Sequence, residues 1–154
     1  MPVPSGSERK SINMPVGLIQ EIEKRVGEKS QKFSEQVCSN LTMFYAVLGE
    51  VQKSMQGRFT LAEIKAVCEV MRGTSIEPER VRLLPQILSL NLADAQSNSN
   101  IAEKYSFDFQ KLELKSHQVT VIEAVWLWDR LNIFWSNPSL QTDENILKIF
   151  SAIL

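Results

Sequence analysis

The sequence has few residues of the types that bind metals or form disulfides. Among its 154 residues there is one histidine, His117, and there are two cysteines, Cys38 and Cys68. A disulfide or a metal site would need partners that the sequence does not supply. Both cysteines fall at apolar positions of helical patterns. We therefore predict that both are buried thiols that act as small hydrophobic side chains.

The sequence also lacks the motifs of catalysis and of cofactor binding. It has no glycine-rich phosphate loop, no paired cysteine or histidine ligands and no Gly-x-Ser-x-Gly elbow. The spacing brings no nucleophile or carboxylate to His117, which we interpret as a surface residue in the first turn of a helix. We therefore expect that the protein is not an enzyme and has no catalytic residues, no metal and no cofactor.

Long hydrophobic runs are absent as well. No stretch of about 18 or more apolar residues exists, so no transmembrane helix is predicted and no membrane partner is expected. Residues 1–8 are rich in Pro, Ser and Gly and have no apolar signal core, so we predict a flexible arm there. These features favour a cytoplasmic protein. With 44% hydrophobic and 23% charged residues, the chain has enough apolar side chains for a packed core.

An excess of positive charge, which would point to nucleic acid, is missing from the chain as a whole. The formal net charge is -1, but it is unevenly distributed. Residues 1–58 carry 8 Lys and Arg against 6 Asp and Glu, for +2, whereas residues 59–154 carry 9 against 12, for -3. A surplus of two is weak by itself, because any solvated face can show it, but dimerisation would double it.

What the sequence does contain is an ordered pattern over residues 9–52. Arg9 to Met14 is a short candidate strand, and Pro15 ends it and suits the first turn of a helix. A helix follows, then a polar loop at 27–32, then a longer helix from Phe33. The strand and first helix are too short to bury themselves, so a partner chain is expected. The apolar positions of the two helices are Leu18, Ile19, Ile22 and Val26, then Val37, Cys38, Leu41, Phe44, Tyr45, Leu48 and Val51.

Part of this pattern resembles a known family of DNA-binding proteins. The segment Arg9-Lys10-Ser11-Ile12-Asn13-Met14-Pro15-Val16-Gly17-Leu18-Ile19-Gln20-Glu21-Ile22 resembles the start of ribbon-helix-helix repressors of the Arc and MetJ type. The alternating strand, the proline after it and the spacing Pro-x-x-Leu-Ile-x-x-Ile carry the resemblance. Phe33-Ser34-Glu35-Gln36-Val37 is similar to that family's entry into its second helix. The resemblance covers about a third of the chain.

The resemblance implies a homodimer, or a higher homo-oligomer, that binds double-stranded DNA. In that family the strands of two subunits pair antiparallel and enter the major groove. Alternation would point Arg9, Ser11 and Asn13 outward to contact bases, since arginine can bond guanine and asparagine can bond adenine. The start of the second helix would hold a phosphate. The implied phosphate contacts are Lys29, Lys32, Phe33 and Ser34, and the implied dimer core is Ile12, Met14, Leu18, Ile22, Val37 and Leu41.

Two departures from the family pattern leave alternatives open. Lys10 falls on the face of the strand that should be apolar, and the loop after Gly27 lacks the family's compact Gly-x-Ser form. The competing interpretation is a protein-interaction or oligomerisation module, or an antitoxin-like binder of a partner protein. In that case the N-terminal strand would close a dimer without touching DNA.

Residues 59–154 show a series of helix signals. Thr60-Leu61-Ala62-Glu63 matches a capping box, Gly73 is placed to end that helix, and Pro85 is placed to open another. Ser97 to Asn100 is predicted as a polar loop. For Ser116 to Trp135 the local residue preferences favour a strand, but the length and spacing favour a helix. Thr142 and Asp143 are predicted to cap a last helix.

Three tryptophans, Trp126, Trp128 and Trp135, fall within ten positions of this second part. We interpret them as helix core or as a subunit interface, with an aromatic ligand pocket as the alternative. Residues 59–154 resemble helical domains of uncharacterised bacterial proteins, which implies no activity. This part would either fix the oligomeric state or bind another protein.

The prediction is thus a mainly α protein. A ribbon-helix-helix module at 9–52, with one strand per subunit, follows the arm at 1–8 and precedes an all-helical domain at 59–154. The predicted function is that of a DNA-binding transcriptional regulator of a bacterial, phage or plasmid type.

Overall fold

A computed structural model describes residues 6, 8–26, 33–136 and 138–154, and within these ranges every regular element is a helix. The chain divides into two compact units, Met1–Tyr45 and Ala46–Leu154. The division falls inside helix α2 (Phe33–Ser54) rather than at its end. The mainly α class agrees with the sequence prediction, whereas the ribbon does not.

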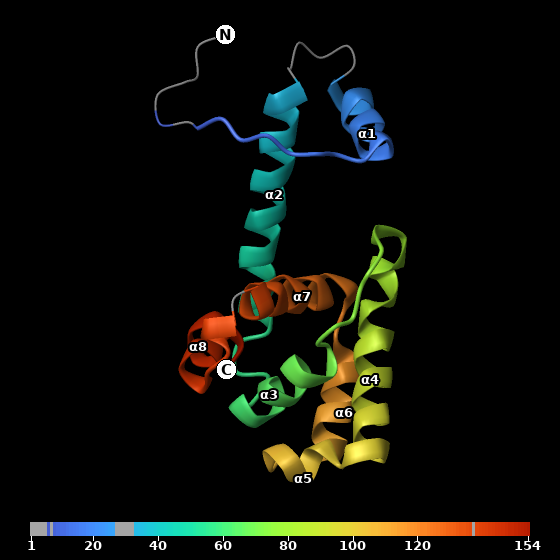
Figure 1. Cartoon of the computed structure of the whole chain (residues 1–154), viewed down its shortest axis with the longest axis vertical. Coiled ribbons are helices and arrows are strands. Elements are labelled where there is room, and N and C mark those ends of the chain that lie inside the picture. The colour runs from blue at the N-terminus through green and yellow to red at the C-terminus, as the bar shows by residue number, and fades with distance from the viewer. Residues whose placement is uncertain (1–5, 7, 27–32, 137) are drawn as a thin grey trace. The chain divides into compact units, whose positions relative to one another are not determined.

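The predicted N-terminal strand is wrong. Residues 8–15 contain no regular secondary structure and lead directly into α1 (Val16–Val26), as Figure 1 shows. The Pro15 carbonyl accepts hydrogen bonds from the N–H groups of Leu18 and Ile19, both at 3.1 Å, and so begins the helix. A strand is stabilised by a ladder to a neighbouring strand, and the described part of this chain offers none. Local alternation alone therefore did not specify a strand.

The C-terminal unit continues from the last turns of α2 through short helices with tight connections. Its elements are α3 (Leu61–Val70), η1 (Pro78–Leu83), α4 (Leu84–Ser99), α5 (Ile101–Tyr105), α6 (Phe109–Gln118), α7 (Val121–Ser136), η2 (Pro138–Leu140), α8 (Asp143–Ile149) and η3 (Ser151–Ile153).

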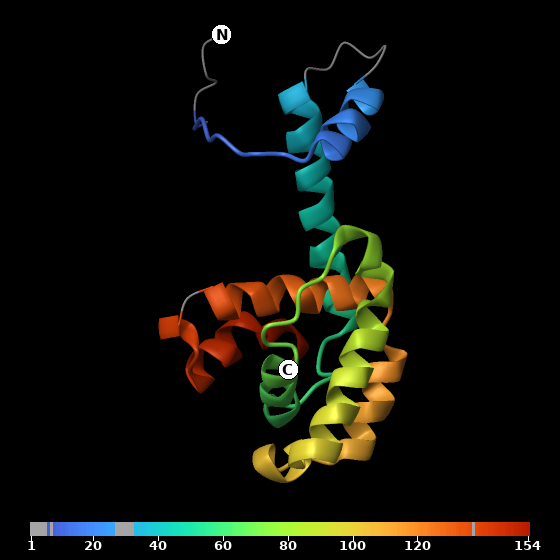
Figure 2. The ribbon, with the colours of Figure 1, turned by 45° about the vertical axis from the view of Figure 1, so that its right-hand side comes forward.

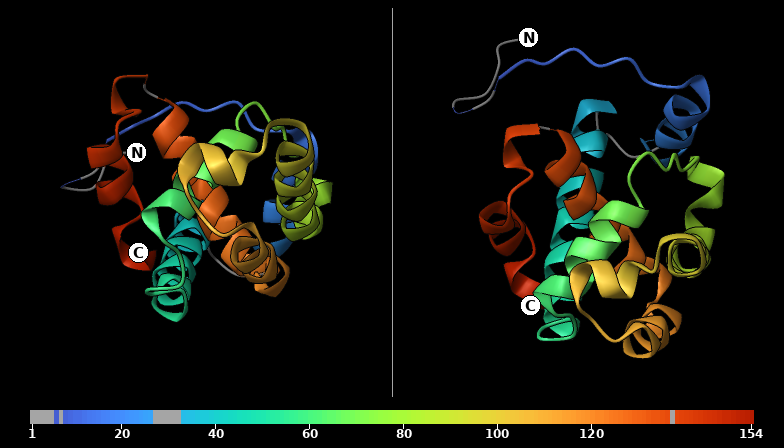
Figure 3. Two further views of the ribbon diagram at one scale, coloured as in Figure 1. Left: turned by 90° about the horizontal axis from the view of Figure 1, so that it is seen from below. Right: turned by 60° about the horizontal axis from the view of Figure 1, so that its bottom comes forward.

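Within this unit α4 and α6 lie side by side, as Figure 1 and Figure 2 both show. α8 and the C-terminal residues lie at the opposite edge, with α3 and α7 between the two edges (Figure 3). The end of the chain lies beside the connection between α2 and α3, where the Phe59 N–H donates a hydrogen bond to the Ile153 carbonyl at 3.2 Å. The fold is therefore closed by contacts between residues almost one hundred positions apart.

The core of the C-terminal unit is apolar and contains side chains from every α-helix of that unit. Trp126 and Phe150 are fully buried and meet edge to face, with 6.4 Å between ring centroids. This confirms core packing for one of the three tryptophans, and Trp128 and Trp135 are partly buried against the same core. Residues of this core below 2% exposure include Met55, Ile64, Val67, Leu92, Ile101, Leu112 and Ile153.

Two capping boxes begin the helices that cross the centre of this unit. At α3 the Thr60 N–H donates to Glu63 Oε1 at 2.9 Å and the Glu63 N–H donates to Thr60 Oγ1 at 3.2 Å, as the sequence predicts. At α7 the same exchange joins Thr120 and Glu123, at 2.9 and 3.3 Å. The second box was not predicted, although Thr120-Val121-Ile122-Glu123 has the required spacing.

Both capping glutamates are buried and each also holds a cation from another helix or turn. Lys115 Nζ of α6 lies 2.6 Å from Glu63 Oε1. Arg58 Nη1 lies 2.7 Å from Glu123 Oε2, which also accepts from Ser54 Oγ at 3.3 Å. A buried carboxylate is tolerated only where its oxygens are paired in this way. Glu123 therefore joins the end of α2 to the start of α7.

Several local predictions need correction. Ser97 to Ser99 are the last turn of α4 rather than a loop, and only Asn100, with φ 47°, leaves the helix. The segment 116–135 is helical, but Val119 interrupts it between α6 and α7. His117 accordingly lies exposed in the last turn of α6, not in a first turn. The helix-ending glycine Gly73, with φ +76°, and the Thr142 cap of α8 are confirmed.

Replacing Glu123 by Gln tests the junction between α2 and α7. Glutamine keeps the capping box but loses the ion pair to Arg58, so the free energy of unfolding should fall by about 1–3 kcal/mol. Urea unfolding followed by circular dichroism measures the change. The matched control is Glu144→Gln, which breaks the exposed Lys148–Glu144 pair on α8 and should change stability by less than about 0.5 kcal/mol. Equal losses in the two variants would contradict the structural role of Glu123.

Candidate interaction surface

The residues predicted to contact bases lie in the segment that precedes α1. Arg9, Ser11 and Asn13 are all exposed there, and the segment belongs to no helix. Ile12, between them, is 68% exposed. The segment thus presents polar and cationic side chains to solvent, but it does not present them from a ribbon.

The residues predicted to hold a phosphate are only partly described. Lys29 and Lys32 lie outside the described residues. Phe33 and Ser34 form the first turn of α2, where Phe33 is half-buried and Ser34 is exposed. The helix start at Phe33 agrees with the sequence prediction. Glu35 also lies in this first turn, where a negative charge complements the helix dipole.

The residues predicted to form a dimer core have very different exposures within one chain. Ile22 is buried, at 6% exposure, and is the only buried residue of α1. Leu18 and Leu41 are 49% and 50% exposed, and Met14 and Val37 are half-buried. The folded chain therefore covers one of these side chains and leaves the others accessible.

One apolar stripe runs along α2, and only its second half is covered. Steps of four, three, four and three residues join its members, which is the spacing of one helix face. Leu48 is 4% exposed and Val51 packs against the core of the C-terminal unit. Leu41 and Phe44 on the same stripe are 50% and 38% exposed. We call the members of this face the α2 stripe: Val37, Leu41, Phe44, Leu48 and Val51.

Further apolar side chains of α2 are exposed beside the stripe. Met43 is 64% exposed and Val47 43%. Tyr45, at 60%, meets Phe44 edge to face with 5.4 Å between centroids. For Met43 and Val47 the sequence signal was their position off the predicted apolar face, whereas Tyr45 was predicted to lie on that face and is exposed.

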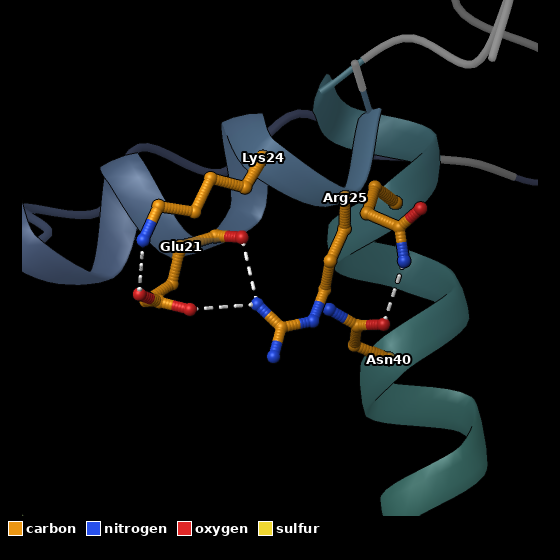
Figure 4. A network of polar contacts seen from close by, with 5 residues as sticks. Glu21, Lys24, Arg25 and Asn40 are labelled. Atoms are coloured by element: carbon orange, nitrogen blue, oxygen red, sulfur yellow. Dashed lines mark hydrogen bonds and ion pairs between the residues drawn. The ribbon is translucent and has the colours of Figure 1, made fainter. Parts of the chain in front are cut away.

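The cations of α1 are engaged within their own helix, as Figure 4 shows. Lys24 Nζ lies 3.0 Å and Arg25 Nη1 lies 3.1 Å from the carboxylate of Glu21, and Arg25 also donates to the Glu21 carbonyl at 2.7 Å. Hydrogen bonds from Lys24 and then from Arg25 lower the pKa of Glu21. On α2 the Gln36 amide donates to Asn40 Oδ1 at 2.8 Å. These contacts are exposed and mainly support the two helices.

The two thiols differ, which corrects the prediction that both are buried. Cys68 on α3 is 4% exposed, and burial raises its pKa to about 12. Cys38 on α2 is exposed. The apolar positions of α2 were identified correctly, but the face that includes Cys38 is not covered within the chain. Periodicity identifies a face and does not show what covers it.

No group of three or more His, Cys, Asp or Glu side chains among the described residues is arranged to hold a metal ion. No helix in the described ranges is long and apolar enough to cross a bilayer.

Comparison of the chain with family models, with curated proteins and with solved structures gives no match.

Thiol reactivity tests the exposures of the two cysteines. In the native protein at pH 8 a chromogenic disulfide reagent should modify one thiol of two, because Cys38 is exposed and Cys68 is buried and protonated. Unfolding in denaturant should release the second. The Cys38→Ser variant should show no rapid reaction. Rapid reaction of that variant would place Cys68 at the surface and contradict the packing of α3.

Proposed function

We propose that the protein is a DNA-binding transcriptional regulator that acts as a homodimer in the cytoplasm. One observation carries the proposal: a short N-terminal unit exposes an apolar helix surface and, directly before its first helix, a segment of polar and cationic residues at 8–14, from here on called the arm. The proposed DNA contact is made by side chains of this arm and requires no β-ribbon.

The support for a dimer is the uncovered half of the α2 stripe. Eight of the fifteen large hydrophobic side chains that are exposed in the described residues fall between Ile12 and Val47. A concentration of exposed apolar side chains in so few residues is typical of association surfaces and supports the dimer. Two copies of the same helix face bring like side chains together, which suits an isologous contact around a two-fold axis.

The support for DNA is the chemistry of the arm. Arg9 and Lys10 are exposed cations, and Ser11 and Asn13 are exposed hydrogen-bonding side chains. Lys10 lies 3.4 Å from Glu8 in a pair that is about 80% exposed on both sides, so solvent and salt weaken that contact. A dimer carries two such arms, which doubles the cationic charge that meets the phosphates. Arms of this kind can order on binding.

A protein partner is the second candidate, because an exposed apolar surface also suits a different chain. The same Leu41 and Phe44 would then contact an amphipathic helix of that partner. In that case the arm would not contact DNA. The two candidates differ in the mass of the purified protein and in its affinity for DNA, so they can be separated.

Leu41→Glu tests the dimer. The wild-type protein should show about twice its chain mass of 17.5 kDa by light scattering after size exclusion. A carboxylate on the stripe would be buried without a partner in the dimer, so the variant should run as a monomer. The matched control is Ser39→Glu, an exposed α2 position off the stripe, which should remain dimeric. A monomeric wild type, or a dimeric Leu41→Glu variant, would contradict the proposed interface.

Asn13→Ala tests the DNA contact, using the duplex recovered by selection from a random pool. The change should reduce discrimination against a mismatched site by about 1–3 kcal/mol and leave the dimer intact. Fluorescence anisotropy over a salt series measures affinity, whose logarithm should fall linearly with the logarithm of salt concentration. Asn132→Ala, an exposed asparagine of α7, is the control and should bind as wild type. If wild-type protein binds no duplex at low salt, the partner-protein candidate replaces this one.

A further inference from the structure

The C-terminal unit contains a cavity that the proposed function does not use. It measures about 240 Å³ and opens between α3, α5, α7 and α8. This is smaller than the roughly 300–1,000 Å³ of pockets for drug-sized ligands, so it suits a molecule with about one ring. The residues that line it are Lys65, Cys68, Glu69, Arg72, Tyr105, Phe134, Trp135, Gln141, Asp143 and Ile146.

Counted with Lys104, which lies outside the lining but pairs with Glu69, the charges around the cavity leave one cation over. Lys65 Nζ lies 2.6 Å from Asp143 Oδ2, so this pair is neutral as a whole. The other lining carboxylate, Glu69, forms an ion pair with Lys104. Arg72 has no acidic partner among the residues that the structure describes. One negative charge on a ligand would complete the balance, and a guanidinium binds a planar carboxylate through two parallel hydrogen bonds.

Aromatic rings form much of the remaining wall. Phe134 is 6% exposed, and Tyr105 and Trp135 are half-buried. Trp135 is held by Trp128, edge to face, with 6.0 Å between centroids. Rings of this kind stack on or meet the edge of a ligand ring at little cost in conformational entropy.

The other polar groups of the wall are neutral hydrogen-bond donors or acceptors. Burial, and then the charge of Glu69, raise the pKa of Tyr105, so its phenol stays protonated at neutral pH. The Cys68 thiol at the wall is protonated too. Gln141 adds an amide that is half-buried. These neutral groups do not repel an anion. The two carboxylates of the wall, Glu69 and Asp143, are each paired with a lysine.

From this geometry we infer that the cavity binds a small aromatic carboxylate, with Arg72 holding the carboxylate and Trp135 and Tyr105 contacting the ring. The inference concerns the C-terminal unit alone and does not depend on DNA binding or on the oligomeric state. Arg72 is exposed at the mouth of the cavity, so the charged group of the ligand stays near solvent and its desolvation cost is low.

Titration of the full-length ¹⁵N-labelled protein with benzoate tests the inference. Benzoate should shift the indole N–H resonance of Trp135 in a saturable way, and Trp135→Phe assigns that resonance. Benzamide has the same shape without the charge and should bind at least tenfold more weakly. Arg72→Gln should weaken benzoate binding by roughly ten- to a hundredfold, because a charge-assisted hydrogen-bond pair is lost.

Arg82→Gln is the matched control, since it removes an exposed arginine that lies outside this cavity, and it should bind benzoate as the wild type does. Thermal unfolding of both variants establishes that they fold. Absence of a saturable shift in the wild type would overturn the inference. Equal binding of benzoate and benzamide, or undiminished binding by folded Arg72→Gln, would overturn it as well.

Discussion

The C-terminal unit depends on the carboxylate of Glu123. One oxygen caps the first turn of α7, and the other holds Arg58 at 2.7 Å and Ser54 at 3.3 Å. A carboxylate at 7% side-chain exposure would be costly without these partners. With them, it fixes where α7 begins relative to the end of α2. Glu63 does the same for α3 and α6 through Lys115, so two buried acids set the positions of four helices.

Among the described residues of the N-terminal unit, only Ile22 is buried. Leu41 and Phe44 stay accessible on a stripe whose other half is covered by the C-terminal core. One chain therefore leaves apolar area of this unit in water, and the same unit contains the exposed cations Arg9 and Lys10. Association with a second copy would remove that area from water at about 25 cal/mol per Å². This is why the proposed dimer and the proposed DNA contact belong to the same unit.

Local signals in the sequence predicted helix ends better than they predicted burial. The Thr60–Glu63 capping box, the Thr142 cap and Gly73 were identified because each depends on residues within a few positions. The strand at 9–14 was wrong because strand formation needs a neighbouring strand, which no local pattern can supply. Cys38 was assigned to the interior because periodicity marks a face without showing its cover. Whether the arm residues touch DNA stays a prediction.

The candidate surface and the cavity differ in how much of each can be predicted from the sequence. The sequence by itself determined that α2 carries an apolar stripe and that Arg9, Ser11 and Asn13 precede the first helix, because residue order and spacing fix both, although it predicted a strand at 9–14. Only the tertiary structure decided which half of the stripe is covered and that Arg72 and Trp135, more than sixty positions apart, line one cavity. Such juxtapositions arise from packing between distant helices, and the free energy of that packing is not contained in any local pattern.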